Sequence, residues 1–361
     1  LSEKLSTDTV EYVDGGHTSQ GAERAALDCE AIRTWVEAVR DEVDAVAVSS
    51  YFSPLNPDHE ERAFALIGEC CDLPVVMGHQ LSTKLDSIKR AATASLNASL
   101  VAVMQEFIEA VRHSLREHGI RAPLMIVRGD GTLMPYTEAI RKPVETVLSG
   151  PAASASGGRF LSGHRDSLVI DMGSTTTDMA LVDEGHVVVS ERGARVGDTE
   201  TAVEAAHIRT LCVGCDSRIS VDRDGGITVG PERIMAISQL ADRHPEVAAQ
   251  IAGLRNRPDH TWRADDIEYW FLYGEPDPAS LGEREARLVD ALRDGPAPVA
   301  ELLQALDVFH ASQLPAEELF RRGELEAAAL TPTDLLHVTG HMNLWDEDAA
   351  RMAVRVLAKV Y

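Results

Sequence analysis

A strand–turn–strand pattern at residues 168–182 constrains the fold of this chain more than any other feature. The apolar run at 168–170 (Leu-Val-Ile) predicts a buried strand, and the run at 179–182 (Met-Ala-Leu-Val) predicts its hairpin partner. The turn between them holds one glycine and four hydroxyl residues, with an acid at each end: Asp171-Met-Gly-Ser-Thr-Thr-Thr-Asp178. The chain is therefore expected to build a sheet that presents this polar turn at its edge.

The residue types of this turn fit the phosphates of a nucleotide. Gly173 lets the backbone approach a ligand closely. Asp171, at the end of the predicted strand, is placed to hold Mg²⁺ through water, and Asp178 to orient the turn or the attacking group. Backbone N–H groups and hydroxyls that can point at phosphate oxygens come from Ser174, Thr175, Thr176 and Thr177. The alternative interpretation is a plain hairpin with a threonine-rich turn.

Composition excludes several classes of partner. The chain has 361 residues, 44% of them hydrophobic, and a formal net charge of −24. This length allows two or three cores, and the negative field repels nucleic acid and anionic membranes, so we expect neither as a partner. No apolar run of membrane-spanning length and no signal peptide at the first residue is visible. Five cysteines without a regular spacing suit a reducing compartment, so we predict a cytoplasmic protein.

Strands and helices alternate through the first part of the chain. Apolar runs at 43–52, 73–78 and 123–127 predict strands, and helical spacing is found at 22–39, 57–71 and 88–117. Residues 1–20 are expected to be loop. This alternation predicts an α/β layer with a mostly parallel sheet, in which ligands collect beyond the carboxyl ends of strands. Four polar residues stand at such ends: Ser49, Tyr51, His79 and Asp130.

The composition and apolar pattern of the sequence change near residue 231, beyond which they predict many helices and an acidic surface. Residues 283–334 are similar in pattern to a small three-helix module of winged-helix type. Its second predicted helix, at 299–306, contains no arginine or lysine, so we interpret the module as a packing insertion and not as a reader of DNA.

Several motifs together resemble the hydantoinase/oxoprolinase family, the ATP-dependent subunits of cyclic-amide hydrolases and their carboxylase relatives. The motifs occur in the family's order and cover essentially the whole chain; those in the middle are specific and the last two are weaker. They are Val46-Ala-Val-Ser-Ser-Tyr-Phe-Ser-Pro-Leu-Asn-Pro57, Leu148-Ser-Gly-Pro-Ala-Ala-Ser154, the turn 171–178, Ile208-Arg-Thr210 with Gly214-Cys-Asp-Ser217, Leu330-Thr-Pro-Thr-Asp334, and Trp345-Asp346.

The resemblance implies an α/β fold with two ribonuclease-H-like domains, as in the actin-like ATPases, and ATP in the cleft between them. We accordingly expect a first lobe at 1–145, a second lobe with the phosphate turn at 146–230, an acidic helical insertion at 231–335 and a return to the second lobe at 336–361. It also implies nucleotide contacts from Gly214, Asp216 and Ser217, and we add Asp130 as a base from the opposing domain.

The activity that the resemblance implies is ATP- and Mg²⁺-dependent hydrolysis of a cyclic amide, of hydantoin or 5-oxoproline type, through a phosphorylated carbonyl oxygen. The expected partners are that small molecule, a second hydantoinase-type subunit and further copies in an oligomer. An ATP-dependent carboxylase subunit or a small-molecule kinase of the same superfamily is the first alternative. A non-catalytic partner protein gated by ATP is the second.

The chain departs from the family's pattern in four places. The N-terminal Asp-Gly-Gly-Thr-type hairpin of domain one and a later glycine-rich adenosine segment are absent, and Ser174 and Cys215 stand where the family often has glycine. The sequence is therefore either a fragment of a longer protein or a member with a degenerate site, and we favour the fragment.

Two further spacings and one single histidine allow other chemistry. Cys212 and Cys215 form a C-x-x-C, but no second pair exists, so we expect them to be reduced and metal-free. His337 and His341 have the spacing of a helical metal pair but lack the glutamate of H-E-x-x-H. His79 ends a predicted strand and is open to either a structural or a functional interpretation.

Overall fold

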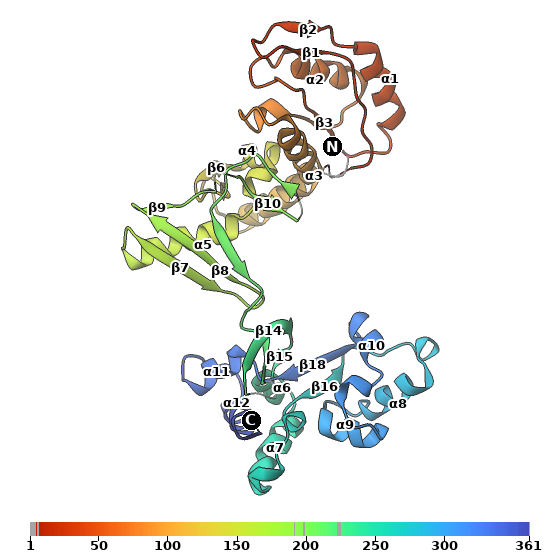
Figure 1. Cartoon of the computed structure of the whole chain (residues 1–361), viewed down its shortest axis with the longest axis vertical. Coiled ribbons are helices and arrows are strands. Elements are labelled where there is room, and N and C mark those ends of the chain that lie inside the picture. The colour runs from red at the N-terminus through yellow and green to blue at the C-terminus, as the bar shows by residue number, and fades with distance from the viewer. Residues whose placement is uncertain (1–4, 6, 191, 198, 222–224, 361) are drawn as a thin grey trace. The chain divides into compact units, whose positions relative to one another are not determined.

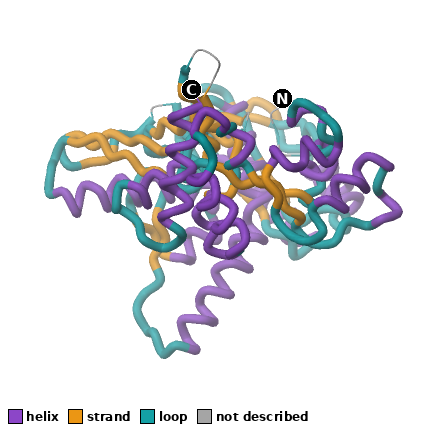
Figure 2. The backbone as a smooth tube through the Cα atoms, turned by 90° about the horizontal axis from the view of Figure 1, so that it is seen from below, coloured by secondary structure: helices purple, strands orange, loops and turns teal. Residues whose placement is uncertain are grey.

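A computed structural model describes residues 5, 7–190, 192–197, 199–221 and 225–360. Helices and short strands alternate along the chain, which gives a mixed α/β structure (Figure 2). The chain divides into two compact units. Unit 1 comprises Leu1–Asp171 and Met179–Arg209, and unit 2 comprises Met172–Asp178 and Thr210–Tyr361. No described helix is long and apolar enough to cross a membrane.

Unit 1 begins with a hairpin and a small α/β layer (Figure 1). Its elements are β1 (Gly16–His17), β2 (Glu23–Ala25), α1 (Cys29–Val39), β3 (Val46–Val48), α2 (Asp58–Cys70), β4 (Val75–Met77) and the long α3 (Ser87–Glu117). Strands β3 and β4 are parallel, with Val46 opposite Val75. The layer closes because α1 and α2 bury Ile32, Val36, Ala63 and Ile67 against Val46.

The first helix starts later than its apolar spacing predicted. Residues 23–25 are a strand and not helix, because Gly21, at φ +80°, turns the chain back so that Glu23 pairs with His17. Helix α1 then begins after Asp28, whose carboxylate accepts a hydrogen bond from the N–H of Ala31 at 3.0 Å. Local turn chemistry therefore overrides the periodicity at this point.

The rest of unit 1 contains most of the two strands of the predicted hairpin, whose turn, Met172–Asp178, is assigned to unit 2. Its elements are β5 (Met125–Val127), β6 (Leu133–Pro135), α4 (Tyr136–Arg141), α5 (Ser149–Ser162), β7 (Ser167–Met172), β8 (Thr177–Asp183), β9 (His186–Val187), β10 (Arg195–Val196) and β11 (Thr199–Glu200). Strands β7 and β8 pair as expected, in a sheet of order β12-β8-β7 with β9 beside β8. The hairpin predicted at 168–182 is confirmed.

The prediction that this hairpin is buried is wrong for one of its faces. Alternate residues of β7, Leu168, Ile170 and Met172, are about half exposed, as is Leu181 of β8. The opposite face is covered, because Gly158 of α5 lies so close to Val169 that an added Cβ would come within 2.9 Å of it. An apolar run therefore marked the strand correctly, but periodicity alone could not say that only one face is packed within the described residues.

Unit 2 is mixed, which corrects the prediction of a helical insertion at 231–335. Its elements are β12 (Ile208–Leu211), β13 (Ser217–Val221), β14 (Ile227–Arg233), β15 (Met235–Ala236), α6 (Ile237–Arg243), α7 (Pro245–Gly253), β16 (Tyr269–Leu272), α8 (Glu283–Ala291), β17 (Ala297–Pro298), α9 (Val299–Leu306), α10 (Glu317–Arg321), β18 (Leu325–Ala329), α11 (Pro332–Val338) and α12 (Glu347–Val360). A four-stranded sheet of order β15-β18-β16-β17 runs through the region. Short apolar runs such as 269–272 are ambiguous between strand and helix, which is why this sheet was missed.

Two cores hold unit 2 together. Helices α6, α7 and α12 pack on one side of the sheet around Ile237, Leu240 and Val356. Helices α8, α9 and α10 occupy the stretch for which the sequence predicted a three-helix module, and they bury Leu288, Leu302 and Leu319 with Trp270 of β16.

The limits of the two units differ from those of the predicted lobes. Residues 146–171 and 179–209 belong to unit 1, because Ala194, Val203 and Ala205 join the core of α3. Helix α5 also packs on β5.

Candidate phosphate-binding turn

The turn between β7 and β8 is closed by its own backbone. The N–H of Gly173 donates to the carbonyl of Thr176 at 2.8 Å. A second loop, at 213–216, is fastened to this turn: Cys215 N–H donates to the Gly173 carbonyl at 2.9 Å, and Asp216 N–H donates to the Ser174 carbonyl at 3.0 Å. The two segments therefore form one rigid double loop within unit 2.

Gly214 is required for this close approach. A Cβ at this position would lie 2.3 Å from the Ser174 carbonyl oxygen and 2.7 Å from that of Gly173. Thr177 adds another fastening, because its buried hydroxyl donates to the Val213 carbonyl at 2.6 Å. Gly214 and Thr177 thus shape the turn from behind, and the Thr177 hydroxyl proton is used within the protein.

The front of the turn is left open. Ser174 and Thr175 are exposed, and their hydroxyl oxygens lie 3.4 Å apart. Among the described residues, none accepts a hydrogen bond from the backbone N–H of Ser174, Thr175 or Thr176. Three N–H groups without an acceptor there, beside two hydroxyls, make a local set of donors of the type that phosphate oxygens accept from, and the phosphate role of these residues stays a prediction.

Acids stand at both ends of the turn and differ in their surroundings. Asp171 is exposed, and its Oδ2 accepts the hydroxyl of Ser154 at 2.6 Å, which leaves Oδ1 without a hydrogen bond among the described residues. Asp178 is half-buried, and its Oδ1 accepts the hydroxyl of Thr210 at 2.5 Å. A carboxylate oxygen that is not used within the protein is the ligand type that hydrated Mg²⁺ takes, so the chemistry of Asp171 fits the predicted metal role, which stays a prediction.

Of the remaining predicted nucleotide residues, one is buried and supports the loop, and the other is partly exposed. Ser217 is fully buried, and its hydroxyl accepts the N–H of Gly214 at 2.9 Å, so it supports the loop from within. The Asp216 side chain is 37% exposed and lies 3.5 Å from an Arg233 nitrogen. Burial, and then the negative charge of Asp216, raise the pKa of the Cys215 thiol. All five cysteines are free thiols.

Asp130 lies in unit 1, in the turn between β5 and β6. Its Oδ1 accepts hydrogen bonds from the N–H of Thr132 at 2.8 Å and from the Thr132 hydroxyl at 2.6 Å. This is the local bonding of an Asx turn at Gly131, whose φ is +86°. The proposed role of Asp130 as a base stays a prediction.

Two partners of the turn were not singled out from the sequence. Ser154 lies on α5 and holds Asp171, and Thr210 lies on β12 and holds Asp178. Each is the last residue of a motif noted above, 148–154 and 208–210. A signal therefore existed, but only the pairing of β12 with β8 and the packing of α5 on β7 show which acid each hydroxyl meets.

The His337–His341 spacing does not form a helical metal pair. His337 is fully buried, Nδ1 donates to the Thr333 carbonyl at 2.9 Å, and Nε2 accepts the N–H of Trp345 at 3.2 Å. The helix ends at Val338, before His341. Both ring nitrogens of His337 are therefore engaged in holding the segment that leads into α12.

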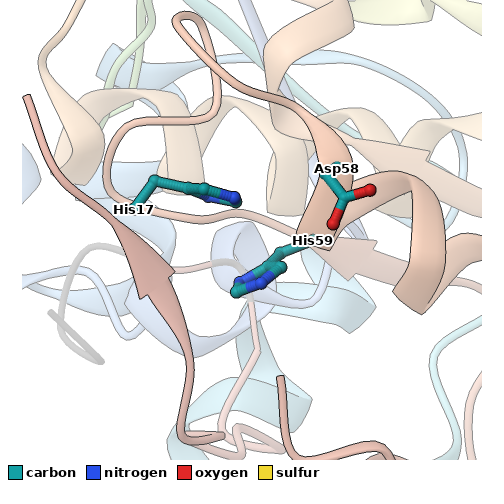
Figure 3. A group of neighbouring side chains, drawn as sticks. All are labelled: His17, Asp58 and His59. Atoms are coloured by element: carbon teal, nitrogen blue, oxygen red, sulfur yellow. The ribbon is translucent and has the colours of Figure 1, made fainter. Parts of the chain in front are cut away.

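A second group of possible metal ligands lies in unit 1, where one ligand atom each from His17, Asp58 and His59 come within 4.8 Å of one another (Figure 3). The two imidazoles overlap, with ring centroids 4.2 Å apart. His59 Nδ1 accepts the N–H of Gly16 at 3.0 Å, so Nε2 must carry the proton that it shares with Glu23 at 2.9 Å. His59 thus has no lone pair left for a cation, and we interpret it as a structural residue of the β1–α2 contact.

Comparison with known proteins identifies the family. The sequence model of the hydantoinase/oxoprolinase family matches residues 90–246, and that of its N-terminal region matches residues 2–71. The chain belongs to the hydantoinase/oxoprolinase family. The first match contains the whole double loop, so the candidate phosphate-binding turn lies in a part of the chain that the family model covers.

Relatives with assigned activities fall into two chemical groups. The chain is 30% identical over 228 residues to the caprolactamase subunit alpha of Pseudomonas jessenii, a match that covers 61% of this chain and 32% of the relative. It is 30% identical over 227 residues to the acetophenone carboxylase gamma subunit of Aromatoleum aromaticum, covering 59% of this chain and 30% of the relative. A 5-oxoprolinase of Arabidopsis thaliana is 25% identical over 215 residues, covering 58% and 17% respectively.

The fold is also that of a solved relative. The crystal structure of the ATP-dependent caprolactamase from Pseudomonas jessenii superposes with a TM-score of 0.55 at 24% identity, over 91% of this chain and 44% of that chain. The hydantoinase-type fold is thus mixed α/β, as the sequence predicted. The chain spans about a third or less of the length of the curated relatives it matches.

Proposed function

We propose that the chain carries the phosphate-binding part of a cytoplasmic, ATP- and Mg²⁺-dependent enzyme that opens a cyclic amide of hydantoin or 5-oxoproline type. The observation that carries the proposal is the double loop, in which the backs of the turn at 172–178 and the loop at 213–216 are joined while three N–H groups and two hydroxyls remain open. Two of the relatives are named for the opening of cyclic amides.

The chemistry follows from the poor reactivity of an amide. ATP would supply the phosphoryl group that converts the resonance-stabilised carbonyl oxygen into a leaving group. The free N–H groups of Ser174, Thr175 and Thr176 would hold the β- and γ-phosphates, and Asp171 would hold hydrated Mg²⁺. Gly214, Thr177 and Ser217 would keep the donors aligned, so that they need no rearrangement as charge develops. In the proposed fold the turn belongs to the second of two actin-like domains.

The alternative is an ATP-dependent carboxylase subunit. It is favoured by one specific observation, the equal identity of 30% to a caprolactamase subunit and to an acetophenone carboxylase subunit over nearly the same number of residues. Both relatives are named as subunits, so we also propose that a second subunit takes part.

Product analysis tests the proposal. The purified protein, with the second subunit if one is encoded beside it, is incubated with ATP and Mg²⁺ and with hydantoin, 5-oxoproline or ε-caprolactam. Ring-opened acid formed together with ADP supports the amidase. Incorporation of labelled bicarbonate into a ketone supports the carboxylase, and a stable phosphorylated product indicates a kinase. Nucleotide binding with no turnover of any of these compounds would contradict an enzymatic role.

A further inference from the structure

Two loops leave unit 1's parallel strands at the same edge. Strand β3 pairs with β4 in register, Val48 opposite Met77, so that residues 49–51 and 78–80 emerge side by side at the carboxyl ends. Ligands of α/β layers collect at this edge. A buried glutamate and a buried arginine fix both loops.

Glu60 holds the N–H groups of the two loops. It is fully buried in the first turn of α2, where the helix dipole favours a carboxylate. Its Oε1 accepts the N–H of Ser50 at 2.7 Å, and its Oε2 accepts the N–H of His79 at 2.9 Å. Oε2 also lies 2.7 Å from His79 Nδ1. Because a carboxylate only accepts, Nδ1 carries a proton, and in the uncharged form of the ring the lone pair lies on Nε2.

Arg90 holds the carbonyl groups of the same loops. It is fully buried on α3, and its guanidinium donates to the carbonyl of Lys84 at 2.7 Å, of Ser50 at 2.6 Å and of Tyr51 at 2.9 Å. The residue after β3 is thereby fixed through both its N–H and its C=O. Loops held in this way present their side chains with little freedom.

Polar groups at this edge remain without partners among the described residues. Ser50 Oγ and Arg90 Nε are buried and make no hydrogen bond. His79 Nε2 also has no partner there, and the His79 side chain is 17% exposed. Buried polar atoms are nearly always satisfied, so unsatisfied ones beside an oriented, accessible imidazole point to a site that a ligand or water completes.

We infer that His79 Nε2 is the hydrogen-bond acceptor for a neutral polar ligand that binds at the carboxyl ends of β3 and β4 and donates through an N–H or O–H group. The carboxylate of Glu60 behind the ring disfavours an anionic ligand, and the terminal nitrogens of the Arg90 guanidinium already donate to carbonyl groups. Resting on the proposed function, this inference assigns the ring N–H of an uncharged cyclic amide as the donor, with His79 as a residue that binds and orients the substrate.

A pair of probe ligands tests the inference without ATP. The 2-pyrrolidone ring donates an N–H, and N-methyl-2-pyrrolidone has nearly the same shape but no donor. In ¹⁵N-histidine-labelled protein, the Nε2 signal that His79→Phe removes should move with 2-pyrrolidone and stay in place with the N-methyl compound. Because no nucleotide is involved, this outcome is independent of whether the protein turns over ATP. Equal movement with both compounds, or movement with neither, would overturn the inference.

Affinity measurements separate binding from a structural role. His79→Phe should weaken 2-pyrrolidone about five- to tenfold, the value of one hydrogen bond, and leave N-methyl-2-pyrrolidone unchanged. His113→Phe is the matched control, because His113 is 67% exposed on α3 and, within the described part of the chain, pairs with Glu117 alone. Glu60→Gln should shift the ¹⁵N signals of His79 away from the Nδ1–H tautomer; if that variant fails to fold, the two phenylalanine variants still decide. Retained discrimination between the probes in His79→Phe would show that His79 only supports the loops.

Discussion

Two segments of unit 2 are built from nearly the same residue types but use their hydrogen-bonding groups differently. Residues 174–178 read Ser-Thr-Thr-Thr-Asp, and residues 330–334 read Leu-Thr-Pro-Thr-Asp. Asp334 is fully buried and accepts hydrogen bonds from backbone N–H groups and hydroxyls at the start of α6 and α11; its donors are Ile237 N–H, Ser238 N–H and hydroxyl, and Thr331 N–H and hydroxyl. In the turn at 174–178, the backbone N–H groups of Ser174, Thr175 and Thr176 have no acceptor among the described residues.

The difference lies in where the donors point. Pro332 starts helix α11, and Asp334 in the first turn of that helix accepts the N–H and hydroxyl of the N-cap residue Thr331, so the motif becomes a capping box. In the other segment, the loop with Gly214 takes up the carbonyl groups of Gly173 and Ser174, and no described residue accepts the N–H groups of residues 174–176. Threonine and aspartate in a short motif therefore indicate bonding capacity, and the neighbouring backbone decides whether protein or ligand uses it.

The largest expected effect is on ATP turnover, and it should follow from a change at Asp171, whereas a change at Asp334 should act on stability. Asp171→Asn keeps the shape of the side chain and removes the charge that, in the proposed function, would hold hydrated Mg²⁺ where phosphate charge develops. Turnover of ATP in the complete enzyme should fall on the order of 10²–10³-fold. The melting temperature should change little, because Asp171 is exposed. Steady-state ATP hydrolysis and melting curves of both proteins check this, and equal rates would return Asp171 to the role of a hairpin residue.

The second effect is on stability. Asp334→Ala leaves three buried backbone N–H groups and two hydroxyls without their acceptor, and should cost about 3 kcal/mol of the free energy of unfolding. Asp178→Asn is the matched control: the amide oxygen can still accept the Thr210 hydroxyl, so its stability should stay within about 0.5 kcal/mol of the parent. Urea unfolding measures both, and similar losses in the two variants would remove the contrast between the segments.

A smaller effect is expected where the two loops join. Gly214→Ala places a Cβ 2.3 Å from the Ser174 carbonyl oxygen and must push the loops apart. This should lower the free energy of unfolding by about 1–3 kcal/mol. Nucleotide affinity should fall with stability. Gly253→Ala, at the end of α7 with nothing within 4 Å of its Cβ, should be neutral. Nucleotide titration that gives parental affinity for Gly214→Ala would show that the double loop does not shape the site.

The smallest expected effect is a difference in alkylation rate between two thiols three residues apart. Cys212 is exposed, whereas burial and the Asp216 charge raise the pKa of Cys215, so its thiolate forms only at higher pH. Iodoacetamide should therefore label Cys212 first near pH 7, and the rate at Cys215 should increase as the pH rises. Peptide mass mapping at several pH values follows both sites. Faster labelling of Cys215 near neutrality would contradict the local environment described here.

The sequence by itself determined the elements that depend on local chemistry. The hairpin at 168–182 followed from two apolar runs around a polar turn, and helix α3 followed from a long apolar period that ends before Gly119. The family followed from the order of motifs, and the open hydroxyls of Ser174 and Thr175 were predicted as phosphate ligands.

Tertiary structure decided which of these polar groups are used within the protein. Nothing in the sequence distinguishes Thr177, whose hydroxyl donates to the Val213 carbonyl, from Thr175, whose side chain is exposed. The sheet of unit 2 and the half-exposed face of β7 were likewise settled by packing between distant segments. The physical reason is that hydrogen-bond capacity belongs to the residue, whereas its satisfaction belongs to whatever backbone the fold brings within about 3 Å.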